Sequence, residues 1–274
     1  MLPIKKIISF FVRSKNLPVV VSFTGGMGAQ VISAAIYFKM KMEGVPVYAD
    51  LSYFDQTPNI AKEGVVGEIS HWEWQLGIFG LQFKDFEINE SLKRKNVEYI
   101  ADGESKMELG LEALFIPKIR NYFTVSCKPI DCIEDWGDAD FLCIHIRRGD
   151  YVNVASHLIN EDVFLDCAKK FTKIIHNVAI LSDSLINDQF KSSISEFFPN
   201  VKILCDLNAD TSHLIMRRAK VLICSNSQFS LIAAALNDEA LALVPSQWYG
   251  EGDRSLEAPI MSRCKFYAFN NLTK

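Results

Sequence analysis

The most specific chemical pattern in the sequence is the segment His145–Tyr151, which reads H-I-R-R-G-D-Y and directly follows an apolar run. Adjacent side chains leave a strand on opposite sides, so one of the two arginines can face a cleft while the other braces the loop. A guanidinium binds two diphosphate oxygens at once and stabilises the charge on a departing diphosphate. We therefore predict Arg147 as a catalytic group, His145 as a donor beside it, and Asp150 as the partner of an arginine.

Three further polar segments follow predicted strands, at residues 25–28, 182–184 and 225–230. The turn Gly25-Gly26-Met27-Gly28 can bring backbone N–H groups close to an anion at a helix N-terminus, or simply connect a strand to a helix. Asp183 offers a carboxylate to a ribose hydroxyl or a base amino group, or caps the next helix. Residues 225–230 suit a phosphate or, again, a helix cap. Because ligands of open α/β sheets bind at the carboxyl ends of strands, these segments predict one cleft.

The elements that must position these residues follow an alternating pattern. Residues 18–23, 29–43 and 45–51 predict a strand, a helix and a strand, which is a β-α-β unit. Alternation resumes after residue 139 with near-continuous apolar strands, as in a doubly wound α/β domain. The predicted strands there are 139–146, 178–181, 201–204, 221–224 and 240–244, and the helices are 161–176, 185–198, 211–219 and 231–236. We expect two domains, 1–135 and 136–274, with 52–138 supplying helices and loops on the acceptor side.

Composition excludes several classes of protein. The 274 residues are 49% apolar and 23% charged, which is globular, and the net charge of −4 argues against nucleic acid as a partner. Seven cysteines without a C-x-x-C pair indicate buried, reduced thiols and hence a cytoplasmic protein. No apolar run approaches the ~20 residues of a membrane span. Residues 1–15 combine an apolar stretch with four basic side chains, which fits either peripheral contact with the inner face of a membrane or a surface helix.

The sequence lacks the motifs of a serine nucleophile and of a metal site. No serine lies in a G-x-S-x-G turn, and the five histidines, at 71, 145, 157, 176 and 213, have no metal-ligand spacing. The D-A-D at 138–140 opens a predicted strand, which is the wrong end for a metal–diphosphate site. The sequence therefore predicts a reaction without a metal or another cofactor.

As a set, these motifs resemble those of the inverting fucosyltransferases of glycosyltransferase family 11, the alpha-1,2-fucosyltransferases. More distantly they resemble the alpha-1,6- and protein O-fucosyltransferases. His145–Tyr151 matches the family's H-x-R-R-G-D-Y, and 25–30 is similar to its G-G-L-G-N-Q. Ser182-Asp183-Ser184 is similar to the family's S-D-D, and 226–230 matches N-S-x-F-S, all in the family's order.

The resemblance implies a GT-B-like α/β fold, in which two Rossmann-like, doubly wound domains face a cleft. It further implies a GDP-β-L-fucose donor, no metal, inversion at the anomeric carbon, and Arg147 on the diphosphate with His145 beside it. Loops and resemblance together give the expected donor-binding residues: Gly25, Gly26, Gly28, Gln30, Arg147, Arg148, Asp183, Asn226, Ser227, Gln228, Phe229 and Ser230. The expected activity is fucosyl transfer to a hydroxyl of a bacterial surface glycan, such as the 2-OH of a galactoside.

Departures from the family pattern bear on the donor and the acceptor. Ala29 replaces an asparagine and Ser184 an aspartate, while Leu231 and Ile232 stand where two tryptophans are common. Two alternatives therefore stay open: the same fold with another nucleotide-deoxysugar donor, or a catalytically inactive protein that binds a nucleotide or glycan. No motif fixes the catalytic base. The candidates are Asp50, Asp55 and His157, each of which also fits an ordinary polar residue at a strand end or in a loop.

Overall fold

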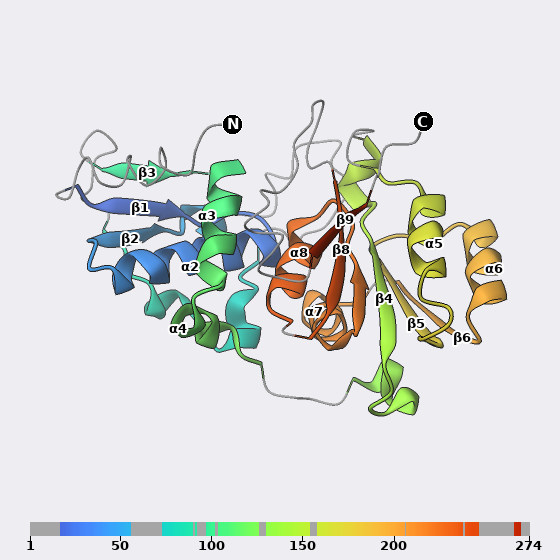
Figure 1. Cartoon of the computed structure of the whole chain (residues 1–274). Helices are drawn as coiled ribbons and strands as arrows, with labels where there is room; N and C mark the ends of the chain where they lie inside the picture. Colours follow the sequence, from blue (N-terminus) through green and yellow to red (C-terminus); the bar gives the residue numbers. More distant parts are fainter. Residues whose placement is uncertain are drawn as a thin grey trace.

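The computed structural model is an α/β protein with two parallel sheets (Figure 1). It describes residues 17–55, 73–89, 91, 97–101, 104–125, 130–153, 158–205, 207–237, 239–246 and 266–269, without the side chains of 104, 105, 150, 153 and 266. The predicted class, two Rossmann-like sheets facing a cleft, is confirmed.

The first sheet is built on the predicted β-α-β unit. Its strands are β1 (Val19–Ser22), β2 (Val47–Asp50) and β3 (Glu98–Ile100), in the parallel order β2-β1-β3. Helix α2 (Met27–Met42) joins β1 to β2 and ends before Gly44, whose φ of +72° suits a glycine. Helices α3 (Glu104–Leu114) and α4 (Pro117–Arg120) follow β3, a strand that the sequence analysis did not predict.

The second sheet has six parallel strands in the order β6-β5-β4-β7-β8-β9. The strands are β4 (Phe141–Ile146), β5 (Asn177–Ser182), β6 (Asn200–Cys205), β7 (Val221–Ile223), β8 (Leu241–Pro245) and β9 (Phe266–Phe269). The helices are α5 (Glu161–Lys169), α6 (Asp188–Phe197), α7 (Ala209–Arg218) and α8 (Gln228–Ala235). This is the order of the dinucleotide-binding fold, and it reverses between β4 and β7. The loops after these two strands therefore flank the crevice where such sheets bind ligands.

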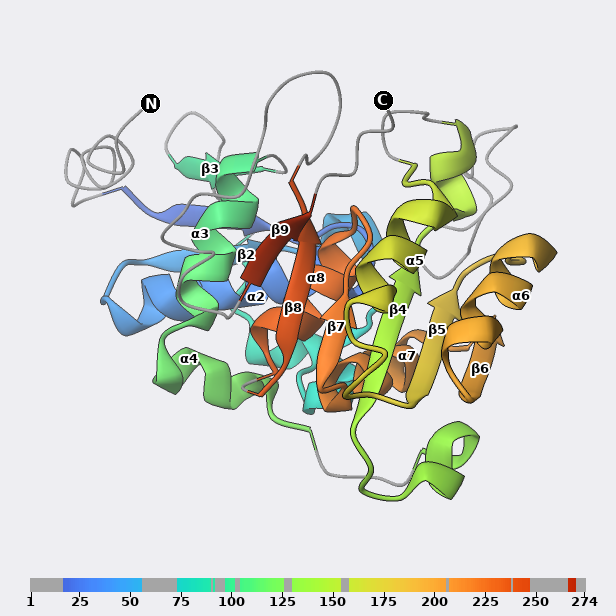
Figure 2. The same ribbon diagram turned by 45° about the vertical axis from the view of Figure 1, so that its right-hand side comes forward.

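The two faces of the second sheet are buried by different helices. Leu142, Ile144 and Ile146 of β4 join a cluster formed with α5 and α6. The alternate residues Phe141 and Cys143 join a larger cluster with α7 and α8. That larger cluster also includes residues of β1, α2 and α3, so α8 lies between the two sheets (Figures 1 and 2).

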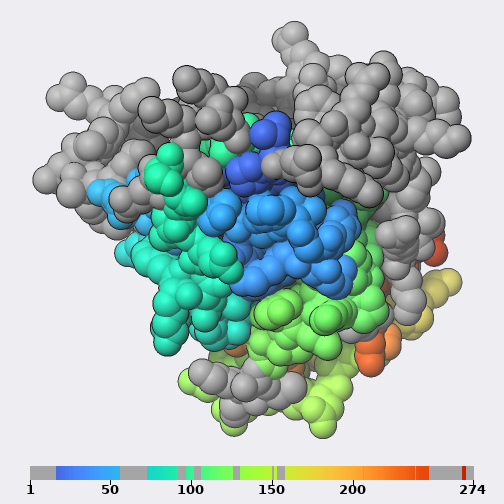
Figure 3. All heavy atoms as spheres, turned by 90° about the vertical axis from the view of Figure 1, so that its left-hand side faces the viewer, coloured from blue at the N-terminus to red at the C-terminus, as the bar shows by residue number. Residues whose placement is uncertain are grey.

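Three described segments lie on the outer face of the first half, which is the part of the molecule that is built on the first sheet. Figure 3 shows the α2 region, in blue, between the segment 73–89, in teal, and the α3–α4 region, in green. Short 3₁₀ turns at Leu76–Phe79 and Phe83–Asp85 shape the teal segment. One buried cluster contains residues from both sides of position 135, so burial does not separate two domains there. The domain boundary at residue 135 stays a prediction.

Of the features that bear on cellular location, the structure describes five of the seven cysteines and the helices searched for a membrane span. Cys143, Cys167 and Cys224 are buried thiols, and Cys132 and Cys205 are half-buried. Among the described helices, none has the length and apolar character that crossing a bilayer requires. Residues 1–15, with the predicted peripheral membrane contact, lie outside the described residues, and the cytoplasmic location stays a prediction.

Candidate functional site

Arg147 lies at the carboxyl end of β4 and pairs with a carboxylate from the neighbouring strand. The β4–β5 register sets Ile146 beside Ser182, which brings the following residues, Arg147 and Asp183, together. Arg147 Nη1 lies 2.7 Å from Asp183 Oδ2, and the side chains are 15% and 13% exposed. The guanidinium carbon also lies 5.6 Å from the ring centroid of Tyr151. The ion pair and the ring hold the guanidinium in one place.

Asp183 also binds the backbone of the arginine loop. Its Oδ1 accepts hydrogen bonds from the N–H groups of Arg148, at 2.7 Å, and Gly149, at 3.1 Å. A Cβ on Gly149 would lie 2.7 Å from Asp183 Oδ2, so glycine allows the loop to close on the carboxylate. Asp183 does not cap α6, since Asn187 does. Asp183 therefore positions Arg147 in this structure, and its contact with a nucleotide stays a prediction.

Arg148 points away from Arg147, as the alternation of side chains predicts. Its Nη2 lies 2.6 Å from Glu161 Oε1, at the start of α5. Arg148 does not line the cavity described below, in contrast to its prediction as a donor-binding residue. The carboxylates that pair with the arginines are Asp183 and Glu161, whereas the side chain of Asp150, the predicted partner, is outside the description.

His145 is buried at the end of β4 and 6% exposed. Its Nδ1 lies 2.7 Å from Ser225 Oγ, beyond β7, and its ring packs edge-on against Phe229. Burial, and then the nearby Arg147 cation, lower the pKa of His145 from 6.5 to about 3. The imidazole is therefore neutral at physiological pH and offers a hydrogen bond but no charge.

The loop after β7 divides the five predicted binding residues into two groups. Ser227, Gln228 and Phe229 line the cavity, and Ser227 caps α8 by accepting from the Phe229 N–H. Asn226 and Ser230 are buried below them. Ser230 Oγ lies within hydrogen-bond distance of the Ser225 and Ser227 carbonyls, so it fixes the loop and does not line the cavity.

The Gly-rich turn brings the start of α2 against the start of α8. Gly25 has φ +67°, a conformation that favours glycine. A Cβ on Gly28 would lie 2.7 Å from both the Gln228 carbonyl carbon and the Phe229 nitrogen. Each helix N-terminus carries a partial positive charge. Because the two N-termini meet here, both face the same hollow.

Gln30 is a clamp rather than a residue that faces the cavity. It is fully buried, and its Nε2 donates to the carbonyls of Gly25 and Glu73, each at 2.8 Å. Its Oε1 accepts from the Gln75 N–H at 2.8 Å, and Gln75 Oε1 accepts from the Met27 N–H at 2.6 Å. Both amide donors are used within the protein and Gln30 does not line the cavity, so its contact with a donor stays a prediction.

These loops surround a cavity of about 940 Å³. The predicted residues that line it are Gly25, Gly26, Gly28, His145, Arg147, Asp183, Ser227, Gln228 and Phe229. Two segments that the sequence analysis did not single out complete it, residues 73–78 and 207–212. The second of these follows β6 at the same sheet edge, so the strand pattern could have indicated it. No local signal marks residues 73–78, which reach the site through the Gln30 clamp.

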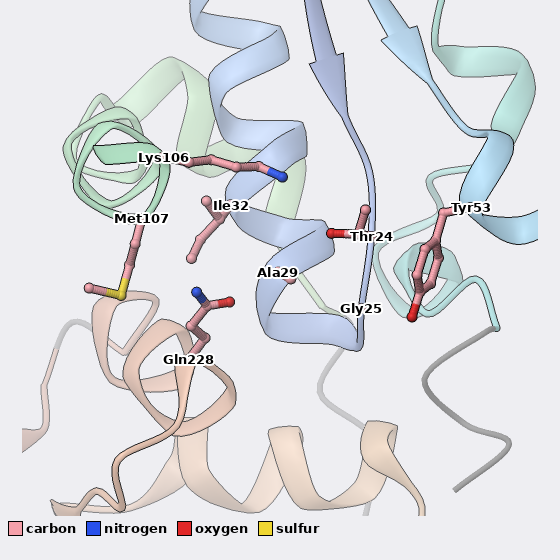
Figure 4. Close-up of a pocket in the computed structure, with 8 residues that line it drawn as sticks. All are labelled: Thr24, Gly25, Ala29, Ile32, Tyr53, Lys106, Met107 and Gln228. Atoms are coloured by element: carbon pink, nitrogen blue, oxygen red, sulfur yellow. The ribbon is translucent and has the colours of Figure 1, made fainter. Parts of the chain in front are cut away.

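A second hollow of about 320 Å³ adjoins the first (Figure 4). It shares Gly25, Ala29 and Gln228 with the main cavity. Lys106 of α3 and Gln228 of α8 lie on one side of the first turn of α2, and Tyr53 lies on the other (Figure 4). Lys106 is 5% exposed, and its Nζ donates to the Ser22 carbonyl at 2.7 Å. This buried cation was missed, because the sequence pattern around it is mixed.

The predicted catalytic bases lie outside both hollows or outside the description. Asp50, at the end of β2, accepts hydrogen bonds from the Ser52 N–H and hydroxyl and from the Tyr99 hydroxyl. Asp55 is exposed in the next turn and lines neither hollow, and His157 lies outside the described residues. In the described part of the chain, no three His, Cys, Asp or Glu side chains gather as a metal site, and the reaction's independence of metal stays a prediction.

Comparisons with known proteins give distant structural similarities. No family model and no curated protein matches the chain. Fucosyltransferase NodZ from Bradyrhizobium is 14% identical with a TM-score of 0.42, over 82% of this chain and 94% of that one. ADP-heptose LPS heptosyltransferase II from E. coli is 10% identical with a TM-score of 0.49, over 94% and 92%. POFUT1 in complex with GDP is 12% identical with a TM-score of 0.42, over 83% and 96%. At this distance none of them supports an inference about this chain, so its function is argued from the site.

Proposed function

We propose that the protein is an inverting, metal-independent glycosyltransferase that uses a nucleotide-diphosphate sugar. The observation that carries this proposal is the convergence of Arg147, His145 and two helix N-termini on one cavity where the strand order reverses. Sheets of this order bind nucleotides at that point. The cavity volume of about 940 Å³ suits a nucleotide sugar, being near the upper end of small-ligand sites.

One part of the cavity, at Arg147 and the first turns of α2 and α8, has positive groups that suit a diphosphate. Arg147 supplies a full charge, and the first turns of α2 and α8 each add a partial positive charge of about one half at the helix end. Asp183 offsets part of the Arg147 charge, and a bound diphosphate would share the guanidinium with Asp183. Positive groups that stabilise a leaving diphosphate take over the work that a metal ion does in other transferases.

In the proposed reaction the acceptor hydroxyl oxygen bonds to the anomeric carbon from the face opposite the diphosphate. The carbon–oxygen bond to the diphosphate breaks, and its electron pair leaves with the phosphate oxygen. One displacement inverts the configuration. Arg147 stabilises the charge that grows on the leaving oxygen, and neutral His145 supplies a hydrogen bond beside it.

We further propose GDP-β-L-fucose as the donor and a hydroxyl of a bacterial surface glycan, such as the 2-OH of a galactoside, as the acceptor. The support is the set of four motifs in family order, of which His145–Tyr151 and 226–230 are complete matches. Ala29 and Ser184 depart from that pattern. The departures make the donor the first thing to measure.

Isothermal titration with GDP, GDP-fucose, UDP and dTDP, all in EDTA, tests the proposal. Micromolar binding of GDP and GDP-fucose without metal supports it. Binding of UDP or dTDP alone keeps a nucleotide site and overturns the fucose donor. No binding of any nucleotide overturns the proposal, and GDP-fucose binding without slow hydrolysis indicates the inactive binding protein.

Arg147→Gln is the matching variant. We expect about 10- to 100-fold weaker GDP binding, because a charge-assisted hydrogen-bond pair is lost. Arg218→Gln, at an exposed arginine on α7, is the control for a changed net charge. Equal GDP affinity in Arg147→Gln and Arg218→Gln would remove Arg147 from the site.

A further inference from the structure

Three acidic residues among the described residues line the main cavity: Glu73, Asp183 and Asp210. Asp183 pairs with Arg147. Asp210 lies in the first turn of α7, on the second half. Glu73 is the acidic lining residue that the first half contributes, so it borders the cavity from the half that does not carry Arg147.

The backbone at Glu73 is held firmly although its side chain is exposed. Its carbonyl accepts from Gln30 Nε2 at 2.8 Å, and the Gln75 N–H donates to Gln30 Oε1 at 2.8 Å. Between them, Trp74 Nε1 donates to the Leu81 carbonyl at 2.8 Å. Gln30 is fully buried, so it fixes this segment to the start of α2. An acidic residue on a fixed backbone at the edge of a ligand cavity suits general-base catalysis.

Among the other candidate bases, Asp210 lies on the half that carries Arg147, and His145 and Asp50 are engaged elsewhere. His145 holds Ser225 through Nδ1 and lies beside Arg147, on the diphosphate side, and its low pKa makes it a poor proton acceptor. Asp50 is held by Ser52 and Tyr99 and lines neither hollow.

We propose, on the basis of the proposed function, that Glu73 is the general base that activates the acceptor. As the acceptor oxygen bonds to the anomeric carbon, its O–H bond breaks and the proton passes to the Glu73 carboxylate. The bond from the anomeric carbon to the diphosphate breaks at the same time, and the diphosphate leaves with the electron pair. Glu73 and Arg147 thus serve the incoming and the outgoing oxygen from opposite halves of the molecule.

Two nucleophiles test this role without the natural acceptor. Water must lose a proton to attack GDP-fucose, whereas azide carries no proton and needs no base. Glu73→Gln keeps the side chain's shape and leaves the backbone carbonyl that Gln30 binds. We expect GDP release by hydrolysis to fall about 10²- to 10⁴-fold in Glu73→Gln. Transfer to azide should stay within about threefold of wild type, and GDP affinity should not change.

Glu196→Gln, at an exposed glutamate on α6, is the control and should match wild type in all three measurements. Hydrolysis within twofold of wild type in Glu73→Gln would overturn the role of Glu73. Equal losses with water and azide would also overturn it, because they indicate a damaged donor site. If the wild-type protein binds no nucleotide sugar, the proposed function is overturned, and the role of Glu73 with it. Titration of the wild-type protein with GDP-fucose distinguishes this result from the two outcomes that overturn only the role of Glu73.

Discussion

At the scale of single residues, the ion pair between Arg147 and Asp183 links stability to ligand binding. Asp183→Asn removes the carboxylate that pairs with the mostly buried Arg147, and removing one partner of such a pair is destabilising. We expect the free energy of unfolding to fall by about 2–3 kcal/mol. Because GDP supplies the missing negative charge, it should raise the Tm of the variant more than that of wild type.

Thermal unfolding with and without saturating GDP measures this effect. Asp188→Asn, at an exposed pair with Lys191, is the control and should leave both Tm values unchanged. An equal GDP-induced shift in wild type and Asp183→Asn would contradict a shared charge between Asp183 and the ligand.

Two buried histidines predict that acid destabilises the protein. Burial, and then a neighbouring arginine, lower the pKa of His145 and of His213 from 6.5 to about 3. Unfolding exposes both rings, which then take up protons below pH 6.5, so their contribution is complete above that pH and is lost as pH falls toward 3. Each ring should cost about 1.4 kcal/mol of stability per pH unit in that window.

His213→Leu isolates one of these rings. In the described part of the chain neither His213 nitrogen has a hydrogen-bond partner, and the ring packs against Phe79 and Phe229. The variant should therefore lose less stability than wild type between pH 7 and pH 5. Urea unfolding at the two pH values measures the difference, and equal losses would show that folding does not lower the pKa of His213.

Residue contacts were predictable where strand geometry decides them. The separation of Arg147 from Arg148 follows from the alternation of side chains alone. The hydrogen bonds of Gln30 and Asp183 could not be predicted in this way. Gln30 binds Glu73, which is 43 residues away in sequence, and Asp183 binds Arg148, which is 35 residues away. A sequence pattern shows that a polar group stands at a strand end, but the packing of the halves decides what it binds.

At the scale of elements, the contact between the starts of α2 and α8 depends on Gly28. In Gly28→Ala the new Cβ meets backbone atoms of Gln228 and Phe229, which have no side-chain freedom to yield. We expect a loss of about 1–3 kcal/mol in the free energy of unfolding. Gly77→Ala, where a Cβ meets nothing within 4 Å, is the matched control for stability. Chemical denaturation compares the two, and equal midpoints would contradict the close approach.

Strands that coincide with an apolar run between polar loops were predicted well. Elements without such a run, and the exact ends of helices, were not. The strands near 139–146, 178–181 and 201–204 are present as β4, β5 and β6. The helix predicted over 161–176 ends at Lys169, although Phe171 and Ile175 keep helical spacing and are buried. Turns after α5 bury the same apolar residues, so spacing alone does not separate a helix from successive turns.

At the scale of the whole molecule, the two halves share one core. A single buried cluster includes β1 and α2 from the first half and α7 and α8 from the second. We therefore expect one cooperative unfolding transition, with the calorimetric enthalpy equal to the van 't Hoff enthalpy. Scanning calorimetry measures both. Two resolved transitions would show that the halves unfold independently and that the shared cluster contributes little.

The adjoining hollows have a practical consequence for inhibitor chemistry. Of the three residues they share, Gly25 has no side chain and Ala29 has only a methyl group. Ala29 also stands where the related motif has an asparagine, whose side chain is larger and polar. A bisubstrate compound, with an anionic head in the larger hollow and a short linker to a ring in the smaller one, would cross the divide at the methyl. Ala29→Asn should lower the affinity for the linked compound and leave the affinities for its two separate fragments unchanged.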